Sequence, residues 1–176
     1  MKLIVFSGIA LVMLLLVSSI PVSVYCQNIQ DEEYGYTKLS GPRLGVTILT
    51  GEIAKKLKDD YDAVPVITQF GWQFETRFFT LEDGTAGLVE GIVLVGGVEQ
   101  GLFLPSLSGL IGVRSKTGFE FGLGPNLSVT GFGLILAAGV NFSSDNINFP
   151  VNFAVLPSDK GLRFTILVGF NAKVRE

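Results

Sequence analysis

The stretch Val66–Phe79 reads VITQFGWQFETRFF and separates its side chains into two sets. Successive side chains of an extended strand point to opposite faces, so each set would occupy one face. The two sets are Val66, Thr68, Phe70, Trp72, Phe74, Thr76 and Phe78, and Ile67, Gln69, Gly71, Gln73, Glu75, Arg77 and Phe79. The stretch therefore predicts one long strand with an aromatic, apolar face and a polar face.

Eight segments of this kind follow one another along the chain. A membrane-spanning strand needs about 9–11 residues at its usual tilt, whereas strands of globular proteins average about 5–6. The length and the even number of the segments predict an all-β fold, an antiparallel up-and-down β-barrel of about eight strands that crosses a membrane. The predicted strands are Arg43–Thr50, Val66–Phe79, Ala86–Glu99, Leu107–Ser115, Phe119–Leu127, Gly131–Phe142, Ile147–Pro157 and Leu162–Asn171.

Two prolines bear on this assignment. Pro105 falls in Gln100–Ser106, which we predict to be a loop between the third and fourth strands. Pro150 falls inside the seventh predicted strand, and a proline within a strand marks an edge or a bulge.

The segment Gly51–Pro65 breaks the alternation. Ile53, Leu57 and Tyr61 recur every four residues in it, with charged residues between them. This spacing predicts one short amphipathic helix in the first loop. Such a helix would be a solvated surface element, a plug of the lumen or an external binding element, and we keep these three residues as a possible interaction loop.

The N-terminal region has the pattern of an export signal. Lys2 precedes the apolar run Leu3–Val17 and a weakly polar end, so residues 1–26 are predicted to be a secretory signal peptide, cleaved near Cys26. In the alternative, Cys26 would be the lipidated N-terminus of a lipoprotein. Residues 27–40 are polar and acidic and are predicted to be a flexible leader, which leaves 41–173 for the barrel domain.

Composition narrows the function. The chain has no histidine, the commonest general base and metal ligand, and its one cysteine lies in the predicted signal peptide. Its net charge is −3, without the basic cluster that nucleic-acid binding requires. We therefore predict no catalytic, cofactor or metal site, no nucleic-acid partner and no enzymatic activity.

The polar set of side chains would face the lumen if the apolar set meets lipid. Glycines of the fifth and sixth strands leave room there for bulky polar groups from other strands. The predicted polar network of the lumen is Arg43, Gln69, Gln73, Glu75, Arg77, Glu120 and Arg163. Because a buried charge must be paired, Glu75 with Arg77 and Glu120 with Arg114 are the candidate ion pairs. The direction of Glu90 is left open.

Five stretches also carry a resemblance to known proteins, namely GPRLGVTILTGEIA at 41–54, FGWQFETRFF at 70–79, GLFLPS at 101–106, GFEFGLGPNLS at 118–128 and NFPVNFAVLPS at 148–158. Over roughly Gly41–Asn171 the chain resembles the small eight-stranded outer-membrane barrels of Gram-negative bacteria. More narrowly, it resembles an uncharacterised family of them in Bacteroidota-type bacteria. The resemblance implies an outer-membrane location, with membrane lipid and the outer-membrane assembly machinery as partners. The usual assembly signal is a C-terminal aromatic residue, whereas here six residues follow Phe170.

Three functions remain at this point. The leading hypothesis is a non-enzymatic outer-membrane barrel with a structural or surface-interaction role. The first alternative is a soluble periplasmic barrel that binds an apolar ligand, which requires Trp72, Phe132 and Phe153 to point inward. The second alternative is a lipid-modifying outer-membrane enzyme, which would need a site without histidine.

Overall fold

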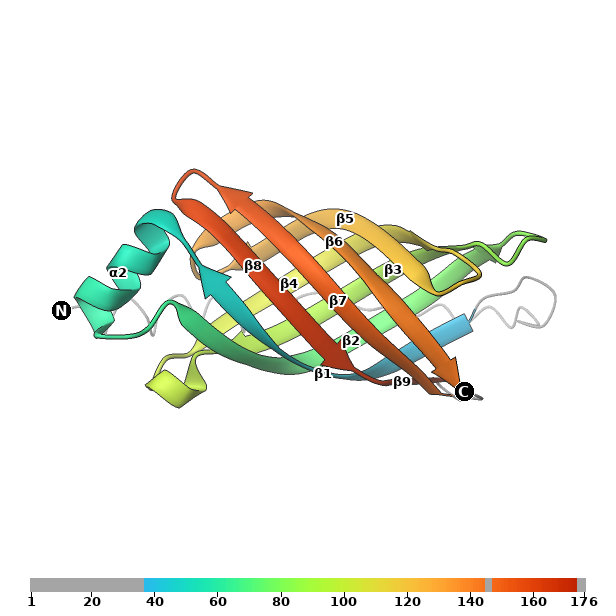
Figure 1. Ribbon diagram of the computed structural model, residues 1–176, viewed down its shortest axis with the longest axis horizontal. Helices are drawn as coiled ribbons and strands as arrows, with labels where there is room; N and C mark the ends of the chain where they lie inside the picture. Colours follow the sequence, from blue (N-terminus) through green and yellow to red (C-terminus); the bar gives the residue numbers. More distant parts are fainter. Residues whose placement is uncertain (1–36, 145–146, 174–176) are drawn as a thin grey trace, which may run out of the picture. The chain divides into compact units, whose positions relative to one another are not determined.

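The computed structural model describes residues 37–144 and 147–173, which form a closed antiparallel β-barrel (Figure 1). Neighbouring strands pair in sequence order, and β1 closes the barrel by pairing with β2 on one side and with β8 and β9 on the other. The predicted all-β barrel, with one helix after the first strand, is confirmed. The elements are β1 (Thr37–Leu49), α2 (Gly51–Tyr61), β2 (Val66–Thr80), β3 (Ala86–Gly96), the short 3₁₀ helix η1 (Val98–Gln100), β4 (Leu104–Arg114), β5 (Phe119–Ser128), β6 (Gly131–Ser144), β7 (Ile147–Ser158), β8 (Gly161–Gly169) and β9 (Asn171–Lys173).

Strands β8 and β9 are two parts of the eighth wall strand, separated at Phe170. On the β7 side, Val151 pairs with Val168 of β8, and Asn148 pairs with Asn171 of β9. Pro150 lies between these two ladders and has no partner in register on that side. A proline is tolerated where a ladder is interrupted, and this interruption is the irregularity that Pro150 predicts.

The first strand is longer than predicted. It begins at Thr37, six residues before Arg43, because the long strand β2 supplies partners as far as Arg77. Residues 37–40 of the predicted leader therefore belong to the barrel wall, and that part of the leader assignment is wrong. The rest of the leader and the predicted signal peptide at 1–26 lie outside the described residues.

The fourth strand is also longer than predicted. It begins at Leu104, so the predicted loop at Gln100–Ser106 is wrong over its last three residues. Pro105 pairs in register with Val95 of β3, since β3 offers partners up to Gly96.

The apolar set of side chains faces outward. Trp72 is 44 % exposed, Phe132 77 % and Phe153 46 %, and exposed aliphatic or aromatic side chains occur on all eight wall strands. We call this ring of side chains the apolar belt. The predicted orientation is confirmed, and the Phe-rich interior that the soluble alternative requires is not present. Within the described ranges, no helix has the length and hydropathy to cross a bilayer.

The barrel has two different ends. The terminal end holds Thr37, Lys173 and the turns after β2 and β4. The helical end holds α2, η1 and the turns after β5 and β7, as Figure 1 shows with α2 at the end opposite β9. Between the two ends, inward-facing apolar side chains form a central cluster, made of Ile92, Leu94, Leu110, Ala137, Ala154 and Leu167.

Candidate functional site

The lumen holds most of the buried polar side chains and is the candidate functional site. On β3 the inward order is Glu90, then Ile92 and Leu94 of the central cluster, so polar groups lie in two sets on either side of it. We call the set at the terminal end the charged cluster, made of Arg43, Gln73, Glu75, Arg77, Glu90, Arg114, Glu120 and Asn171.

Arg114 of β4 is the centre of the charged cluster. Its Nη1 and Nη2 atoms donate to Oε1 and Oε2 of Glu75 over 2.6 and 2.7 Å, and its Nε atom donates to Oε1 of Glu120. The Nε atom of Arg77 lies 3.5 Å from Oε1 of Glu75. Both predicted ion pairs are therefore present, but Arg114 rather than Arg77 is the principal partner of Glu75.

Arg43 of β1 extends the cluster across the ladder interruption. Its Nε atom donates to Oε1 of Gln73 and its Nη2 atom to Oδ1 of Asn171, both over 2.8 Å. The carbonyl oxygen of Phe170, at the interruption, accepts from Nη1 over 3.4 Å. Asn171 donates in turn to Oε2 of Glu75 over 3.3 Å. Arg43, through Asn171, and Arg114, directly, are therefore both linked to the carboxylate of Glu75.

Glu90 points inward and lies directly opposite Glu75 in the register of β2 and β3. With Glu120 and Asn152 it lines a cavity of about 10 Å³, enough for about one water molecule. The three carboxylates of the cluster thus face three guanidinium groups. Of the three carboxylates, Glu75 and Glu120 are hydrogen-bonded to Arg114, and a buried charge is tolerated when it is paired in this way.

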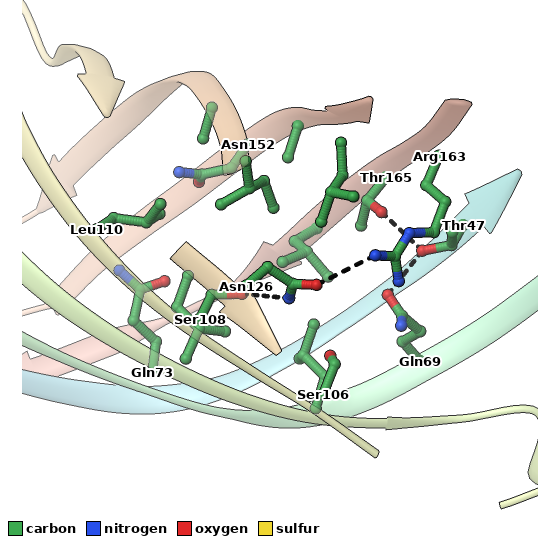
Figure 2. A pocket seen from close by; sticks show the side chains of 17 residues that line it. Thr47, Gln69, Gln73, Ser106, Ser108, Leu110, Asn126, Asn152, Arg163 and Thr165 are labelled. Carbon is green, nitrogen blue, oxygen red and sulfur yellow. Dashed lines mark hydrogen bonds between the residues drawn. The ribbon is translucent and has the colours of Figure 1, made fainter. Parts of the chain in front are cut away.

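A larger space, which we call the mouth cavity, lies on the helical side of the cluster and has a volume of about 60 Å³ (Figure 2). Arg163 of β8 reaches across it to β5, where Nη1 donates to Oγ of Ser128 over 2.9 Å and Nη2 to Oδ1 of Asn126 over 3.3 Å. Thr47 lies on another wall and donates to Oε1 of Gln69 over 2.7 Å. The polar residues that line the mouth cavity are Thr47, Gln69, Gln73, Ser106, Ser108, Asn126, Asn152, Arg163 and Thr165.

Helix α2 covers part of the mouth. Ile53 and Leu57 are 7 % and 8 % exposed and pack with Leu49, Ala63 and Ile67, whereas Tyr61 is 50 % exposed. Of the three residues of the predicted interaction loop, only Tyr61 therefore lies on the surface, and the other two are buried against the ends of β1 and β2.

Backbone contacts anchor the start of α2 to the turn after β7. The N–H of Ile53 donates to the carbonyl of Lys160 over 3.2 Å, and the N–H of Thr50 donates to that of Leu162 over 3.0 Å. Gly51 adopts a φ of 69°, and a Cβ there would lie 2.7 Å from the Lys160 oxygen. The close approach of the two segments thus requires glycine at this position.

The 3₁₀ helix η1 completes the helical end. Gln100 donates from Nε2 to the Val66 carbonyl over 2.7 Å, and Oε1 of Glu99 accepts the N–H of Thr68 over 2.8 Å. Partial burial alone would raise the pKa of Glu99, but the hydrogen bonds from Thr68 and Gln100 outweigh it and lower the pKa from 4.5 to about 2. These hydrogen bonds hold η1 against the first residues of β2.

The structure divides the seven predicted lumen residues between two places. Gln69 and Arg163 line the mouth cavity, Gln73 lies between the cavity and the charged cluster, and the other four lie in the charged cluster. Sequence reasoning missed Asn126 and Asn171, although both fall in the same alternation phase as Glu120 and Arg163. Within residues 37–144 and 147–173, no group of three or more His, Cys, Asp or Glu side chains is arranged to hold a metal.

Comparison with known proteins supports the fold. No protein-family model matches the chain, and no curated protein sequence matches it significantly. The structure of Ail, the attachment invasion locus protein of Yersinia pestis, in complex with the heparin analogue sucrose octasulfate, is 12 % identical with a TM-score of 0.50, and the match covers 79 % of this chain and 97 % of Ail. The de novo designed barrel TMB2.3 is 13 % identical with a TM-score of 0.47, over 84 % of this chain and all of that one.

These findings define a class. The chain shares with Ail the fold of a small, closed, antiparallel β-barrel. At this level of identity the likeness concerns the fold alone. The narrower resemblance to a Bacteroidota family stays a prediction.

Proposed function

We propose that this protein is an outer-membrane β-barrel with a non-enzymatic, structural or surface-interaction role. The observation that carries the proposal is the apolar belt, which surrounds the whole wall. Exposed apolar area on this scale is costly in water and favourable in lipid. A closed barrel also satisfies its backbone hydrogen bonds within the wall, which is the condition for crossing a bilayer with strands. Membrane lipid is accordingly the first partner.

The helical end would face the cell exterior. In outer-membrane barrels the periplasmic turns are short and the external loops are longer. Here the terminal end carries short turns, such as Ser115–Gly118, and the helical end carries α2 and η1. We infer that the described termini lie on the periplasmic side, where the outer-membrane assembly machinery would receive the chain.

A surface-interaction role would use the exposed side of this end. Tyr61 and the charged side chains of α2 point away from the lumen, and the hydrogen bonds of Ile53 and Gln100 hold both segments in place. The fold shared with an attachment protein is compatible with such a role. The protein partner stays unidentified.

No observation favours the lipid-modifying enzyme. Such an enzyme without histidine would rely on a free carboxylate such as Glu75, which here accepts hydrogen bonds from Arg114 and Asn171 and is buried.

Cysteine labelling from the lipid phase tests the proposal. In a Cys26→Ser background, Leu134→Cys and Phe164→Cys place a thiol on the outer face of β6 and β8, and Ala137→Cys places one in the lumen on β6. We expect a bilayer-dissolved thiol reagent to label the first two variants and to spare the third. Failure of both outer positions to react in detergent-free membranes, or release of the protein by osmotic shock, would overturn the proposal.

A further inference from the structure

The mouth cavity contains a positive charge that the barrel itself does not balance. Among the residues that line this cavity, Arg163 is the charged one, and its two hydrogen-bond partners, Ser128 and Asn126, are neutral. The carboxylates of the charged cluster lie on the far side of the central cluster. The Nε atom of Arg163 is buried and has no hydrogen-bond partner within the described residues. A partly buried charge without a carboxylate partner favours a counter-ion.

Two glutamine side chains that line the cavity use their amide oxygens in hydrogen bonds to other residues. The Oε1 atom of Gln69 accepts from Thr47, and that of Gln73 accepts from Arg43. Both glutamine side chains line the cavity. Each amide oxygen therefore already accepts one hydrogen bond, and the Nε2 group of each amide is a donor.

Asn126 uses both its oxygen and its nitrogen in hydrogen bonds within the barrel. Its Oδ1 atom accepts from Arg163, and its Nδ2 atom donates to Oγ of Ser108 over 2.9 Å, as Figure 2 shows. The buried Oδ1 atom of Asn152, at the floor of the cavity, is an acceptor without a partner among the described residues. A water molecule or the protonated oxygen of a ligand would satisfy it.

We propose that the mouth cavity binds one small oxyanion, a phosphate or sulfate group, on Arg163 with the amide group of Gln69. The planar guanidinium matches the geometry of such groups, and charge-assisted hydrogen bonds are about twice as strong as neutral ones. A volume of about 60 Å³ suits a single oxyanion and excludes a sugar or a nucleotide as a whole.

The site is open to solvent. Arg163, Ser106 and Ser128 are each only half-buried, so the cavity reaches the helical end beside α2. The oxyanion could therefore be free in solution or be the phosphate of a lipid headgroup, since both present the same group to Arg163.

The first test measures binding of the free anion. The full chain, refolded in a glucoside detergent that contains no phosphate, is titrated calorimetrically with sodium sulfate and with inorganic phosphate at constant ionic strength. We expect saturable binding, weakened about tenfold or more in Arg163→Gln, because that variant loses the charged donor. Lys160→Gln is the matched control. Lys160 is exposed on the adjacent turn after β7, and its substitution removes one positive charge from the same end of the barrel. Heat-modifiable migration on gels shows that each variant is folded.

The second test identifies the source of the oxyanion, and its measurement uses the wild-type protein alone. The side-chain Nε–H resonance of Arg163 is followed by NMR while phosphate is added, and then in bicelles with and without phosphatidic acid. A shift with phosphate alone assigns the site to a free anion, and a shift with phosphatidic acid assigns it to a lipid headgroup. The proposal is wrong if the resonance moves with neither, or if the wild type and Arg163→Gln give the same titration curve.

Discussion

Two arginines on opposite sides of the central cluster have very different surroundings. Arg114 pairs in register with Glu120 and donates to both oxygens of Glu75. The register partners of Arg163 are Leu49 and Leu156, so its side chain reaches across the lumen to neutral groups.

The difference separates structure from possible ligand chemistry. In the charged cluster, three carboxylates meet three guanidinium groups and the remaining space is about 10 Å³, so the cluster joins strands and has little room for anything else. The mouth cavity has six times that volume, about 60 Å³, and one unbalanced cation. The same residue type is thus used for packing at one end and is available for binding at the other.

The largest expected effect comes from breaking the charged cluster. Arg114→Met leaves Glu75 and Glu120 buried without their partner, and removal of one member of a buried ion pair typically costs about 3–5 kcal/mol. We expect the free energy of unfolding in lipid vesicles to fall by that amount, measured by urea titration with heat-modifiable migration as the readout. Arg163→Met, which leaves only neutral groups behind, is the matched variant and should cost about 1 kcal/mol. Equal losses in the two variants would remove the distinction between the two arginines.

The second prediction concerns a substitution that should loosen only the helical end. Leu57→Ala removes a buried side chain from the contact between α2 and the mouth, and such truncations cost about 2 kcal/mol or more. Because α2 lies outside the wall, we expect the loss to appear as local opening, with faster amide hydrogen exchange in α2 and unchanged exchange in β4 and β5. Tyr61→Ala, at an exposed position of the same helix, should leave both unchanged. Faster exchange throughout the wall would show that the helix is part of the barrel core.

The third prediction compares packing in the two halves. Ala86 is buried opposite Arg114 in the ladder of β3 and β4, whereas Ala154 lines the mouth cavity. Two added methyl groups should destabilise the packed site by about 1 kcal/mol or more in Ala86→Val, and should cost close to nothing in Ala154→Val. Urea unfolding of the two variants checks this. A greater loss in Ala154→Val would mean that the mouth cavity does not admit added volume.

The period of two in the sequence was enough to predict the wall and its orientation. In Val66–Phe79 it assigns Trp72 to the outside and Glu75 to the inside, because a strand offers its side chains only these two directions. The same reasoning extends to Asn126 and Asn171, whose positions were predictable from phase alone. Phase says nothing about distance across the lumen, however, so the pairing of Arg114 with Glu75, 39 residues apart, needed the coordinates.

Predictions made from a residue's own chemistry were least accurate where pairing with a neighbouring strand decides the local structure. Pro105 predicted a loop from its own chemistry, but β3 offers a partner at Val95, and the strand begins before the proline. The role of Leu57 depends in the same way on what α2 meets. An amphipathic period predicts a helix with an apolar side, and only the fold shows that this side covers the mouth.

The smallest expected effect concerns the hydrogen bonds that fix η1 at the helical end. Glu99 has a folded-state pKa of about 2, below its ordinary 4.5, so folding favours its charged form. Its contribution to stability is therefore fully present above pH 4.5, declines as the pH falls towards about 2, and is absent below that value. The amide N–H of Thr68, which donates to this carboxylate, should titrate in NMR spectra with a midpoint near the lowered pKa. In Glu99→Gln the same resonance should not respond to pH. A midpoint at the ordinary value in the wild type would show that η1 is not held to β2 in solution, and the helical end would then be less ordered than the charged cluster.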